Sequence, residues 1–266
     1  MVKRWAFFAV ACALITAVTG CGGGGVGDEQ TLKVGASQVP HSEILNHVKP
    51  RLEKEGVKLE VKVLQDYVTP NKAVQEGQLD ANFFQHIPWM KTTNKERGWD
   101  LASVGKVHIE PIGAYSSKVK KKSQLKDGAT VAMPNDPTNG ERALLLLDKE
   151  GLIKLDEKDG VKTLKNIKSN PKNLKFKALE AATLPRVLDQ VDLAVINTNY
   201  ALQAKLNPKK DALFLEGADS PYANVLAVKK GNENKPAIKK LIKVLQSDDT
   251  KKFIEEKYKG SVQPAF

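Results

Sequence analysis

The sequence predicts an α/β protein that is divided into two lobes. Strand and helix patterns alternate along most of the 266 residues, and the first of them form a β-α-β unit. Residues 32–36 and 59–64 are the two predicted strands, and the apolar positions between them recur at helical spacing. Such a unit favours a parallel sheet with a right-handed crossover. Pro50 lies inside the helical pattern and is expected to kink or shorten the helix.

The later strands suggest how the chain is divided. Further predicted strands cover residues 81–84, 101–104, 112–116, 130–133, 174–178, 193–196, 212–215 and 225–229. Strand-dense segments at the two ends bracket a middle section with strands and helices of its own, as though the chain leaves one lobe, builds another and returns. We therefore assign residues 31–111 plus 226–266 to lobe 1 and residues 112–225 to lobe 2, with a binding cleft between them.

Two helices are predicted at the carboxyl end. Ile238, Leu241, Ile242 and Leu245 make one apolar face, Asn234 is the predicted cap, and Pro236 falls in the first turn, where no amide donor is required. A second helix is expected from about Asp249 to near Gly260.

The amino terminus predicts secretion and lipidation. Lys3 and Arg4 precede an uncharged, apolar run that is shorter than a membrane span and ends at small residues before Cys21. Residues 1–20 are the predicted signal peptide, Cys21 the predicted lipidation site, and residues 21–30 a glycine-rich tether. A plain signal peptide with a chance cysteine is the alternative. Since Cys12 leaves with the signal, the mature chain could form no intrachain disulfide.

The formal net charge of +11 raises the possibility of nucleic-acid binding. Residues 118–122 are the densest basic block, but lysines elsewhere alternate with acidic residues. Aromatic residues make up only 6% of the chain, and no stacking motif accompanies the basic block. A solvated lysine-rich surface, facing water or an anionic membrane, is therefore favoured over a nucleic-acid site.

Motifs of known catalytic chemistry are missing from the sequence. It has no Gly-x-Ser-x-Gly elbow, no phosphate loop and no His-Glu-x-x-His. Its histidines, His41, His47, His86 and His108, share no ligand spacing with one another or with a carboxylate cluster. We therefore expect neither an enzyme nor a metal site, and no cofactor.

The polar segment 135–142 is the strongest candidate for a binding site. It follows a predicted strand and precedes an apolar helix, so a helix amino terminus with unpaired N–H groups faces the strand end. Arg142, one turn into the helix, could add a bidentate guanidinium to a bound carboxylate. The alternative is that Thr138 or Asn139 merely caps the helix and Arg142 makes a surface pair. Local sequence leaves both interpretations open.

Other polar or aromatic groups also follow predicted strands. Tyr67, Phe84 and Trp89 would project into a crevice at the carboxyl ends of parallel strands, or else pack in the core. Asn197 and Asn199 could meet the ammonium and carboxylate of an amino acid, or else cap a helix from Tyr200.

Taken in order, these segments closely resemble the methionine-binding lipoproteins of bacterial ABC importers, over about residues 32 to 260. The matching motifs are Asp66-Tyr67-Val68-x-Pro70-Asn71, Asp80-Ala81-Asn82-x-Phe84-Gln85-His86-x-Pro88, Pro134-Asn135-Asp136-Pro137-Thr138-Asn139-x-x-Arg142, Leu179-Glu180-Ala181, Leu184-Pro185-Arg186, Ile196-Asn197-x-x-Tyr200-Ala201 and Ser220-Pro221-Tyr222-x-Asn224.

The resemblance implies a two-lobed type II periplasmic-binding-protein fold, with L-methionine bound in the interlobe cleft and delivered to a permease and its ATPase. It places the carboxylate-binding arginine at Arg142 and the amide contacts to the amino-acid head at Asn139, Asn197 and Asn224. It assigns the thioether slot to Tyr67, Phe84, His86 and Tyr115. The protein would be a monomer, lipid-anchored on the extracytoplasmic side of the cell membrane. Related proteins also bind other methionine forms or a Gly-Met dipeptide, and a non-transport surface lipoprotein used for adhesion or scaffolding is a further alternative.

Overall fold

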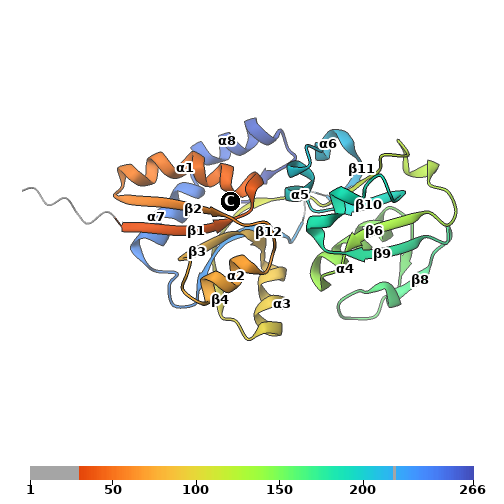
Figure 1. Ribbon diagram of the computed structural model, residues 1–266, viewed down its shortest axis with the longest axis horizontal. Coiled ribbons are helices and arrows are strands. Elements are labelled where there is room, and N and C mark those ends of the chain that lie inside the picture. The colour runs from red at the N-terminus through yellow and green to blue at the C-terminus, as the bar shows by residue number, and fades with distance from the viewer. Residues whose placement is uncertain (1–29, 218–219) are drawn as a thin grey trace, which may run out of the picture.

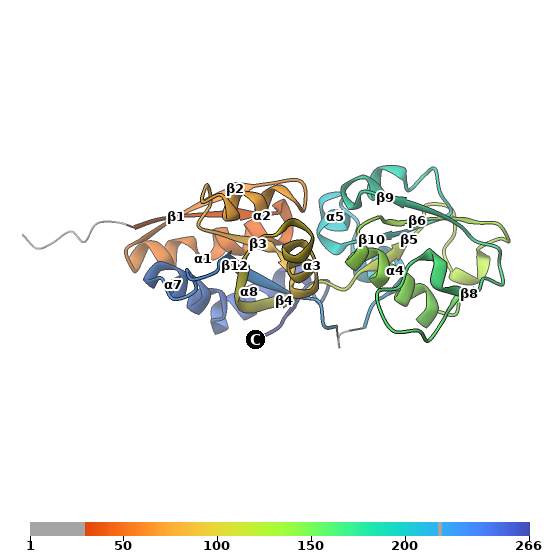
Figure 2. The ribbon, with the colours of Figure 1, turned by 90° about the horizontal axis from the view of Figure 1, so that it is seen from below.

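Two lobes lie side by side along the long axis of the molecule (Figures 1 and 2). This computed structural model describes residues 30–217 and 220–266. The predicted signal peptide, Cys21 and all but the last residue of the predicted tether lie outside the described residues. Within the described residues, no helix is both long enough and apolar enough to cross a membrane.

Lobe 1 is built on a six-stranded sheet in the order β13-β4-β12-β3-β1-β2. Its strands are β1 (Gln30–Ala36), β2 (Val57–Val63), β3 (Ala81–His86), β4 (Leu101–Ile109), β12 (Ala223–Lys229) and β13 (Gln263–Pro264). Its helices are η1 (Gln38–Ser42), α1 (Glu43–Lys54), α2 (Thr69–Gln75), α3 (Ile87–Arg97), α7 (Pro236–Leu245) and α8 (Asp248–Tyr258). The strand β1 pairs in parallel with β2 and β3, as the β-α-β pattern predicted, whereas β12 runs antiparallel to β3 and β4.

Lobe 2 is built on a five-stranded sheet in the order β11-β5-β10-β6-β9. Its strands are β5 (Gly113–Tyr115), β6 (Thr130–Pro134), β9 (Lys175–Leu179), β10 (Leu193–Ile196) and β11 (Ala212–Leu215). The remaining elements are the paired strands β7 (Lys154–Leu155) and β8 (Ile167–Ser169), with α4 (Pro137–Lys149), α5 (Thr198–Gln203), α6 (Pro208–Asp211), η2 (Lys122–Gln124), η3 (Leu164–Asn166) and η4 (Ala181–Val187). The short strands β7, β8 and β13 were not predicted.

The chain passes between the lobes twice, at residues 110–112 between β4 and β5, and again between β11 and β12. The predicted end of lobe 2 at residue 225 needs correction. The strand β12 already pairs with β4 from Ala223, opposite Ile109. The first residues of β12 therefore belong to the sheet of lobe 1.

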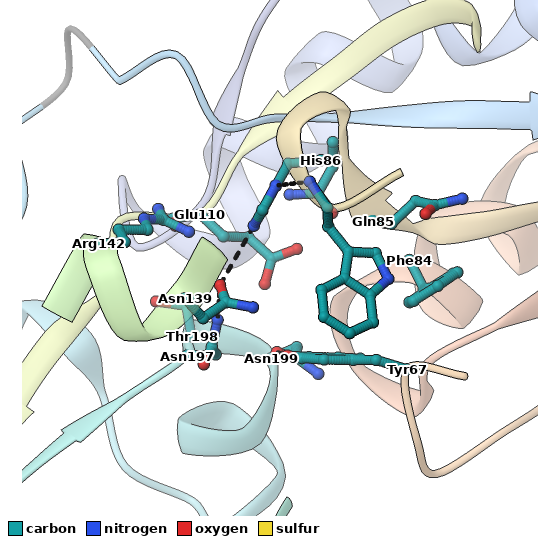
Figure 3. A pocket seen from close by; sticks show the side chains of 12 residues that line it. Tyr67, Phe84, Gln85, His86, Glu110, Asn139, Arg142, Asn197, Thr198 and Asn199 are labelled. Atoms are coloured by element: carbon teal, nitrogen blue, oxygen red, sulfur yellow. Dashed lines mark hydrogen bonds between the residues drawn. The ribbon is translucent and has the colours of Figure 1, made fainter. Parts of the chain in front are cut away.

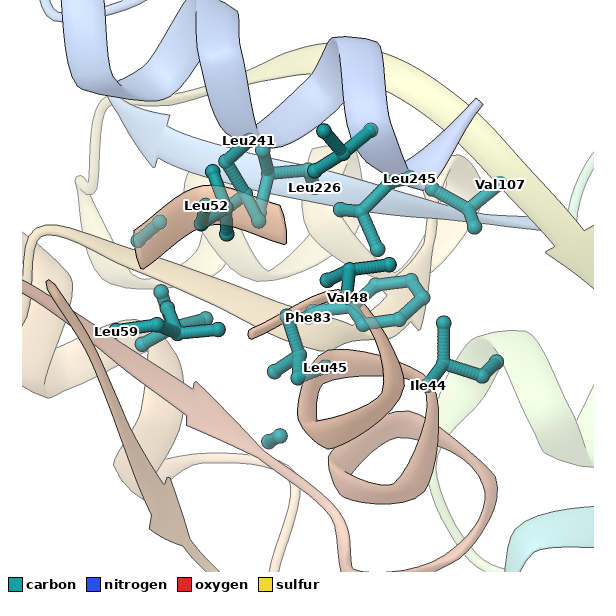
Figure 4. Close-up of a cluster of buried hydrophobic side chains, with 14 of the residues drawn as sticks. Ile44, Leu45, Val48, Leu52, Leu59, Phe83, Val107, Leu226, Leu241 and Leu245 are labelled. Atoms are coloured by element: carbon teal, nitrogen blue, oxygen red, sulfur yellow. The ribbon is translucent and has the colours of Figure 1, made fainter. Parts of the chain in front are cut away.

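The core of lobe 1 explains why Pro50 does not shorten its helix. The helix α1 continues through Pro50 to Lys54. Its aliphatic face, together with Leu241 and Leu245 of α7, packs over Phe83 in the centre of the sheet (Figure 4). An interior proline costs about 3 kcal/mol, whereas each fully buried aliphatic side chain contributes about 1.5–3 kcal/mol. Burial on both sides of Pro50 therefore outweighs the lost backbone hydrogen bond.

The predicted cap of α7 was wrong, and so was the cap that the alternative interpretation placed at the start of α4. The cap of α7 is Lys235, one residue after Asn234, and Pro236 is the first helical residue. The cap of α4 is Asp136, whose carboxylate accepts a hydrogen bond from the Asn139 backbone N–H at 2.8 Å. Thr138 and Asn139 both lie inside the first turn of α4, so their side chains are not used as its cap.

Candidate ligand-binding site

A pocket lined by residues of both lobes lies between them. Figure 3 shows aromatic side chains from lobe 1 on one side of it and the helix that carries Asn139 and Arg142 on the other. The lining residues are Tyr67, Phe84, Gln85, His86, Trp89, Glu110, Asn139, Arg142, Asn197, Thr198, Asn199 and Asn224. Every residue predicted to bind the ligand is among them, except Tyr115.

The strand β3 and the start of α3 form the lobe 1 wall. Every residue of β3 is buried, and its last residue, His86, caps α3. The His86 Nδ1 atom accepts a hydrogen bond from the Trp89 backbone N–H at 3.1 Å, so its Nε2 atom is left to donate to Asn139 Oδ1 at 3.2 Å. Burial, and secondly the positive charge of Arg142, lower the pKa of His86 to about 3. The imidazole is therefore neutral and joins the two lobes through one hydrogen bond.

The aromatic end of the pocket is centred on Tyr67. Its ring lies 5.8 Å from Phe84, 5.7 Å from Trp89 and 5.1 Å from Tyr200 between ring centroids. Its hydroxyl donates to Asn199 Oδ1 across the lobes at 2.6 Å. These flat walls suit an unbranched apolar chain, because they can contact it along its whole length.

Arg142 is buried beside the pocket, with 3% of its side chain exposed. Its Nε atom donates to Glu216 Oε1 at 2.9 Å, while Nη2 donates to Glu216 Oε2 and, at 2.7 Å, to the Glu110 carbonyl oxygen. The guanidinium also covers the ring of Tyr222 at 4.3 Å. Because Arg142 is buried, the alternative that it makes an ion pair on the protein surface is excluded. The Nε and Nη2 edge of the guanidinium, which could have made the predicted bidentate contact, already binds a carboxylate of the protein, and Nη1 makes no hydrogen bond to any described residue.

Asn139 joins both lobes at the polar end of the pocket. Its Nδ2 atom donates to the Asp136 carboxylate at 3.1 Å, and its Oδ1 atom accepts from Asn197 Nδ2 at 2.8 Å as well as from His86. Burial raises the pKa of Asp136, against the hydrogen bonds that Asn139 and Thr138 supply.

A buried acid, Glu110, lies on the first crossover between the lobes. Its Oε1 atom is 2.7 Å from His108 Nε2 and 3.1 Å from His41 Nε2. The His41 Nε2 atom is also 3.0 Å from Asn224 Oδ1. Burial raises the pKa of Glu110, and it lowers the pKa of His41 to about 4 and that of His108 to about 3.

Glu110, His41 and His108 place three potential metal ligands within 4.8 Å of one another. His108 Nε2 hydrogen-bonds to Glu110 Oε1, whereas His41 Nε2 lies 3.1 Å from the same oxygen and hydrogen-bonds to Asn224 Oδ1. His108 Nδ1 has no partner among the described residues. A metal-binding imidazole normally donates its second ring N–H to a supporting acceptor. We therefore interpret the three side chains as a hydrogen-bonded network.

Three buried polar atoms of the pocket lining lack a partner among the described residues. They are Trp89 Nε1 and Asn199 Nδ2, which are donors, and Asn197 Oδ1, which is an acceptor. An unpaired buried polar atom costs about 1–3 kcal/mol. The lining is therefore suited to a ligand that has both donors and acceptors.

Tyr115 was wrongly predicted to line the pocket. It is 1% exposed and packs with Leu184 and Ile196 in a core cluster of lobe 2. Its side chain therefore points into lobe 2 instead of the cleft. The resemblance that suggested Tyr115 did not show which face of its strand the side chain occupies.

Five lining residues are not among those that the family resemblance assigned to the ligand: Gln85, Trp89, Glu110, Thr198 and Asn199. Local sequence had offered Trp89 and Asn199 as candidates with core packing or capping as the alternative, and Gln85 and Thr198 lie next to assigned residues. Glu110 had no such signal, because its role depends on His41, which is 69 positions away along the chain.

Comparisons with known proteins agree over nearly the whole chain. The family model described as NlpA lipoprotein matches residues 32–266. The chain is similar to the methionine-binding lipoprotein MetQ of Bacillus subtilis, with 43% identity over 94% of this chain and 93% of the relative. It is 42% identical to the D-methionine-binding lipoprotein MetQ of Escherichia coli over 98% of both chains.

Solved structures show the same relationship. A nutrient-binding protein from Burkholderia cenocepacia bound to methionine has a TM-score of 0.86 and 48% identity, covering 88% of this chain and 100% of its own. A periplasmic substrate-binding protein of an ABC transporter from Coxiella burnetii has a TM-score of 0.85 and 42% identity, with coverage of 88% and 100%. The chain therefore belongs to the NlpA lipoprotein family and has the two-lobed fold of periplasmic substrate-binding proteins.

Proposed function

We propose that this protein is the membrane-anchored substrate-binding component of an ABC importer, that it binds L-methionine, and that it acts by lobe closure without catalysis. The observation that carries the proposal is the polarity of the interlobe pocket, which has aromatic rings at one end and Arg142, Glu110 and amides at the other. The names of the relatives support methionine as the ligand.

The polar end provides opposite charges for a zwitterion. Arg142 Nη1 and the amides of Asn139 and Asn197 are suited to the carboxylate, since all can donate hydrogen bonds. Glu110 and the unpaired Asn197 Oδ1 are suited to the ammonium. In Figure 3, Glu110 lies between Arg142 and the aromatic side chains. An ammonium beside Glu110 would oppose the effect of burial on its pKa, because a nearby positive charge favours the ionised carboxyl.

The aromatic end fits the rest of methionine. Tyr67, Phe84 and Trp89 line a narrow space that a flexible thioether can follow. Contacts between sulfur and an aromatic ring contribute about 0.3–1.5 kcal/mol each. A branched side chain would fit these flat walls less well.

Anchoring and delivery complete the proposal. Cys21, once lipidated, would hold the protein on the extracytoplasmic face of the cell membrane. The protein would work as a monomer that passes methionine to a permease and its ATPase.

The two unpaired donors favour a second candidate ligand. Trp89 Nε1 and Asn199 Nδ2 line the pocket near Tyr67, and a thioether is a weak acceptor. A methionine derivative with an oxygen on its side chain, such as the sulfoxide, would supply the acceptor that methionine lacks.

A ligand panel tests these alternatives. Residues 22–266 are unfolded to remove any bound ligand, refolded, and examined by thermal shift and calorimetry with L-methionine, D-methionine, methionine sulfoxide, Gly-Met and leucine. We expect L-methionine to stabilise the protein with one-to-one stoichiometry, since a ligand that binds only the folded state raises its stability. A stronger effect of sulfoxide or Gly-Met would instead indicate a receptor for that compound.

The same ligand panel tests whether the protein is instead a scaffold or adhesion lipoprotein, or an enzyme. If no compound stabilises the protein, the result would favour a scaffold or adhesion lipoprotein. Prolonged incubation should return unchanged methionine, and its consumption would indicate an enzyme.

A further inference from the structure

Glu216 binds the guanidinium of Arg142 but does not line the pocket. We propose that Glu216 is a positioning residue, which orients Arg142 so that Nη1 meets the ligand carboxylate and links this contact to both crossovers between the lobes. This inference rests on the proposed function.

The contacts of Arg142 leave it little freedom. The carboxylate of Glu216 accepts from both Nε and Nη2, which is the bidentate geometry that most strongly orients a guanidinium. The Glu110 carbonyl oxygen holds Nη2 from another direction at 2.7 Å, and the ring of Tyr222 covers one face. Rotation of the guanidinium would break the paired bonds to Glu216, so Nη1 is held in one position beside the pocket.

Glu216 also connects the two crossovers. It directly follows β11, and its backbone N–H donates to the Ile112 carbonyl oxygen at 2.9 Å on the other crossover. The Ile112 backbone N–H is 3.4 Å from Glu216 Oε2, and the Ser220 hydroxyl donates to the same oxygen at 3.2 Å. One carboxylate therefore bridges Arg142 and both segments that must bend when the lobes open.

This arrangement determines how a ligand carboxylate can be recognised. Because its Nε and Nη2 edge is occupied, Arg142 can offer a ligand only the Nη1 side of its fork. Glu216 also keeps the buried positive charge paired when no ligand is present, and breaking such a pair leaves an uncompensated charge. Selectivity for a carboxylate should therefore depend on Glu216, although Glu216 does not touch the ligand.

The test compares L-methionine with L-methioninamide, which keeps the ammonium and the thioether but replaces the carboxylate with a neutral amide. Calorimetry is carried out on the wild type, Glu216→Ala and Glu216→Gln, with circular dichroism to verify folding. We expect Glu216→Ala to lower the preference for methionine over the amide at least tenfold, with most of the loss in methionine binding. Glu216→Gln keeps the size of the side chain and one acceptor, so we expect an intermediate loss. If Glu216→Ala does not fold, the preference of Glu216→Gln for methionine over the amide tests the proposal.

Glu150→Ala is the matched control. Glu150 pairs with Lys122 at 2.7 Å in lobe 2, and its side chain is 21% exposed, compared with 16% for Glu216. Its removal should leave the affinities for both ligands unchanged.

The outcomes separate this inference from the proposed function. Equal losses for both ligands in the Glu216 variants would indicate a merely structural role and overturn the assignment, as would an unchanged preference for methionine. A wild-type protein that binds neither ligand would contradict the proposed function and, with it, the role of Glu216.

Discussion

The two walls of the pocket are built differently. The lobe 1 wall rests on β3, whose Asn82 and Gln85 form a buried amide network with Asn71 of α2 at distances of 2.7–2.9 Å. Its one lining atom without a partner among the described residues is Trp89 Nε1 in α3. The lobe 2 wall carries Asn197 and Asn199, each with one amide atom that has no partner among the described residues. A satisfied network is rigid, whereas an unsatisfied one gains most from a ligand. The difference suggests that lobe 1 sets the shape of the ligand and lobe 2 recognises its head group.

Removal of the lobe 2 charge should have the largest effect. We expect Arg142→Ala to weaken methionine binding at least tenfold, because breaking a buried charge pair costs about 3–5 kcal/mol and here also leaves Glu216 unpaired. Calorimetry measures the affinity, and Arg51→Ala, which removes an exposed arginine of lobe 1, is the control. Near-normal affinity of Arg142→Ala would contradict the assignment of this wall to the head group.

Acidification should lower the free energy of unfolding through the buried histidines of lobe 1. The folded-state pKa values of about 4 for His41 and about 3 for His86 and His108 are below the ordinary 6.5. Between these values the unfolded chain binds more protons, so the free energy of unfolding should fall as the pH decreases from 7 towards 4. Each histidine contributes up to about 1.4 kcal/mol per pH unit.

The raised pKa of Glu110 has the opposite sign, since its folded state takes up a proton first, and offsets part of this loss. Urea denaturation followed by circular dichroism at pH 7, 6 and 5 measures the net slope. Stability that is constant or rises on acidification would show that these imidazoles are not held neutral by burial.

The hydrogen bond between Tyr67 and Asn199 should have a smaller effect. We expect Tyr67→Phe to weaken methionine binding about three- to tenfold, because a typical hydrogen bond contributes about 0.5–1.5 kcal/mol and this one joins the lobes. Tyr115→Phe is a matched control, since the Tyr115 hydroxyl is buried without a partner among the described residues and lies outside the pocket. Similar losses in both variants would show that the contact between the lobes has no special role.

The smallest expected effect is that of replacing Trp89 in the lobe 1 wall. Trp89→Phe removes a donor without a described partner while retaining an aromatic ring, so methionine affinity should change by less than about threefold. Binding of methionine sulfoxide should fall more, if its oxygen accepts from Trp89 Nε1. Competition calorimetry with the two compounds measures the ratio, and an unchanged ratio would exclude this donor as a selectivity determinant.

Local patterns in the sequence were sufficient for most elements and for much of the pocket. Alternating strands and helices predicted β1, α1 and β2, because their apolar periods match the faces that become buried. Polar residues after strands gave Asn139, Asn197 and the end of β3, which the structure brings together in one pocket. The ligand and the role of each residue came from the resemblance to a family, since local chemistry left capping and binding equally open.

The sequence by itself determined the α/β class, the division into two lobes, and the motifs that line the cleft. Only the tertiary structure decided that Tyr115 faces the core, that Glu110 joins His41 and His108, and that Glu216 holds Arg142. The physical reason is distance along the chain. Periodicity reports which face of an element is apolar, but pairing between buried charges depends on segments that meet only when the whole chain has folded, such as Arg142 and Glu216, which are 74 positions apart.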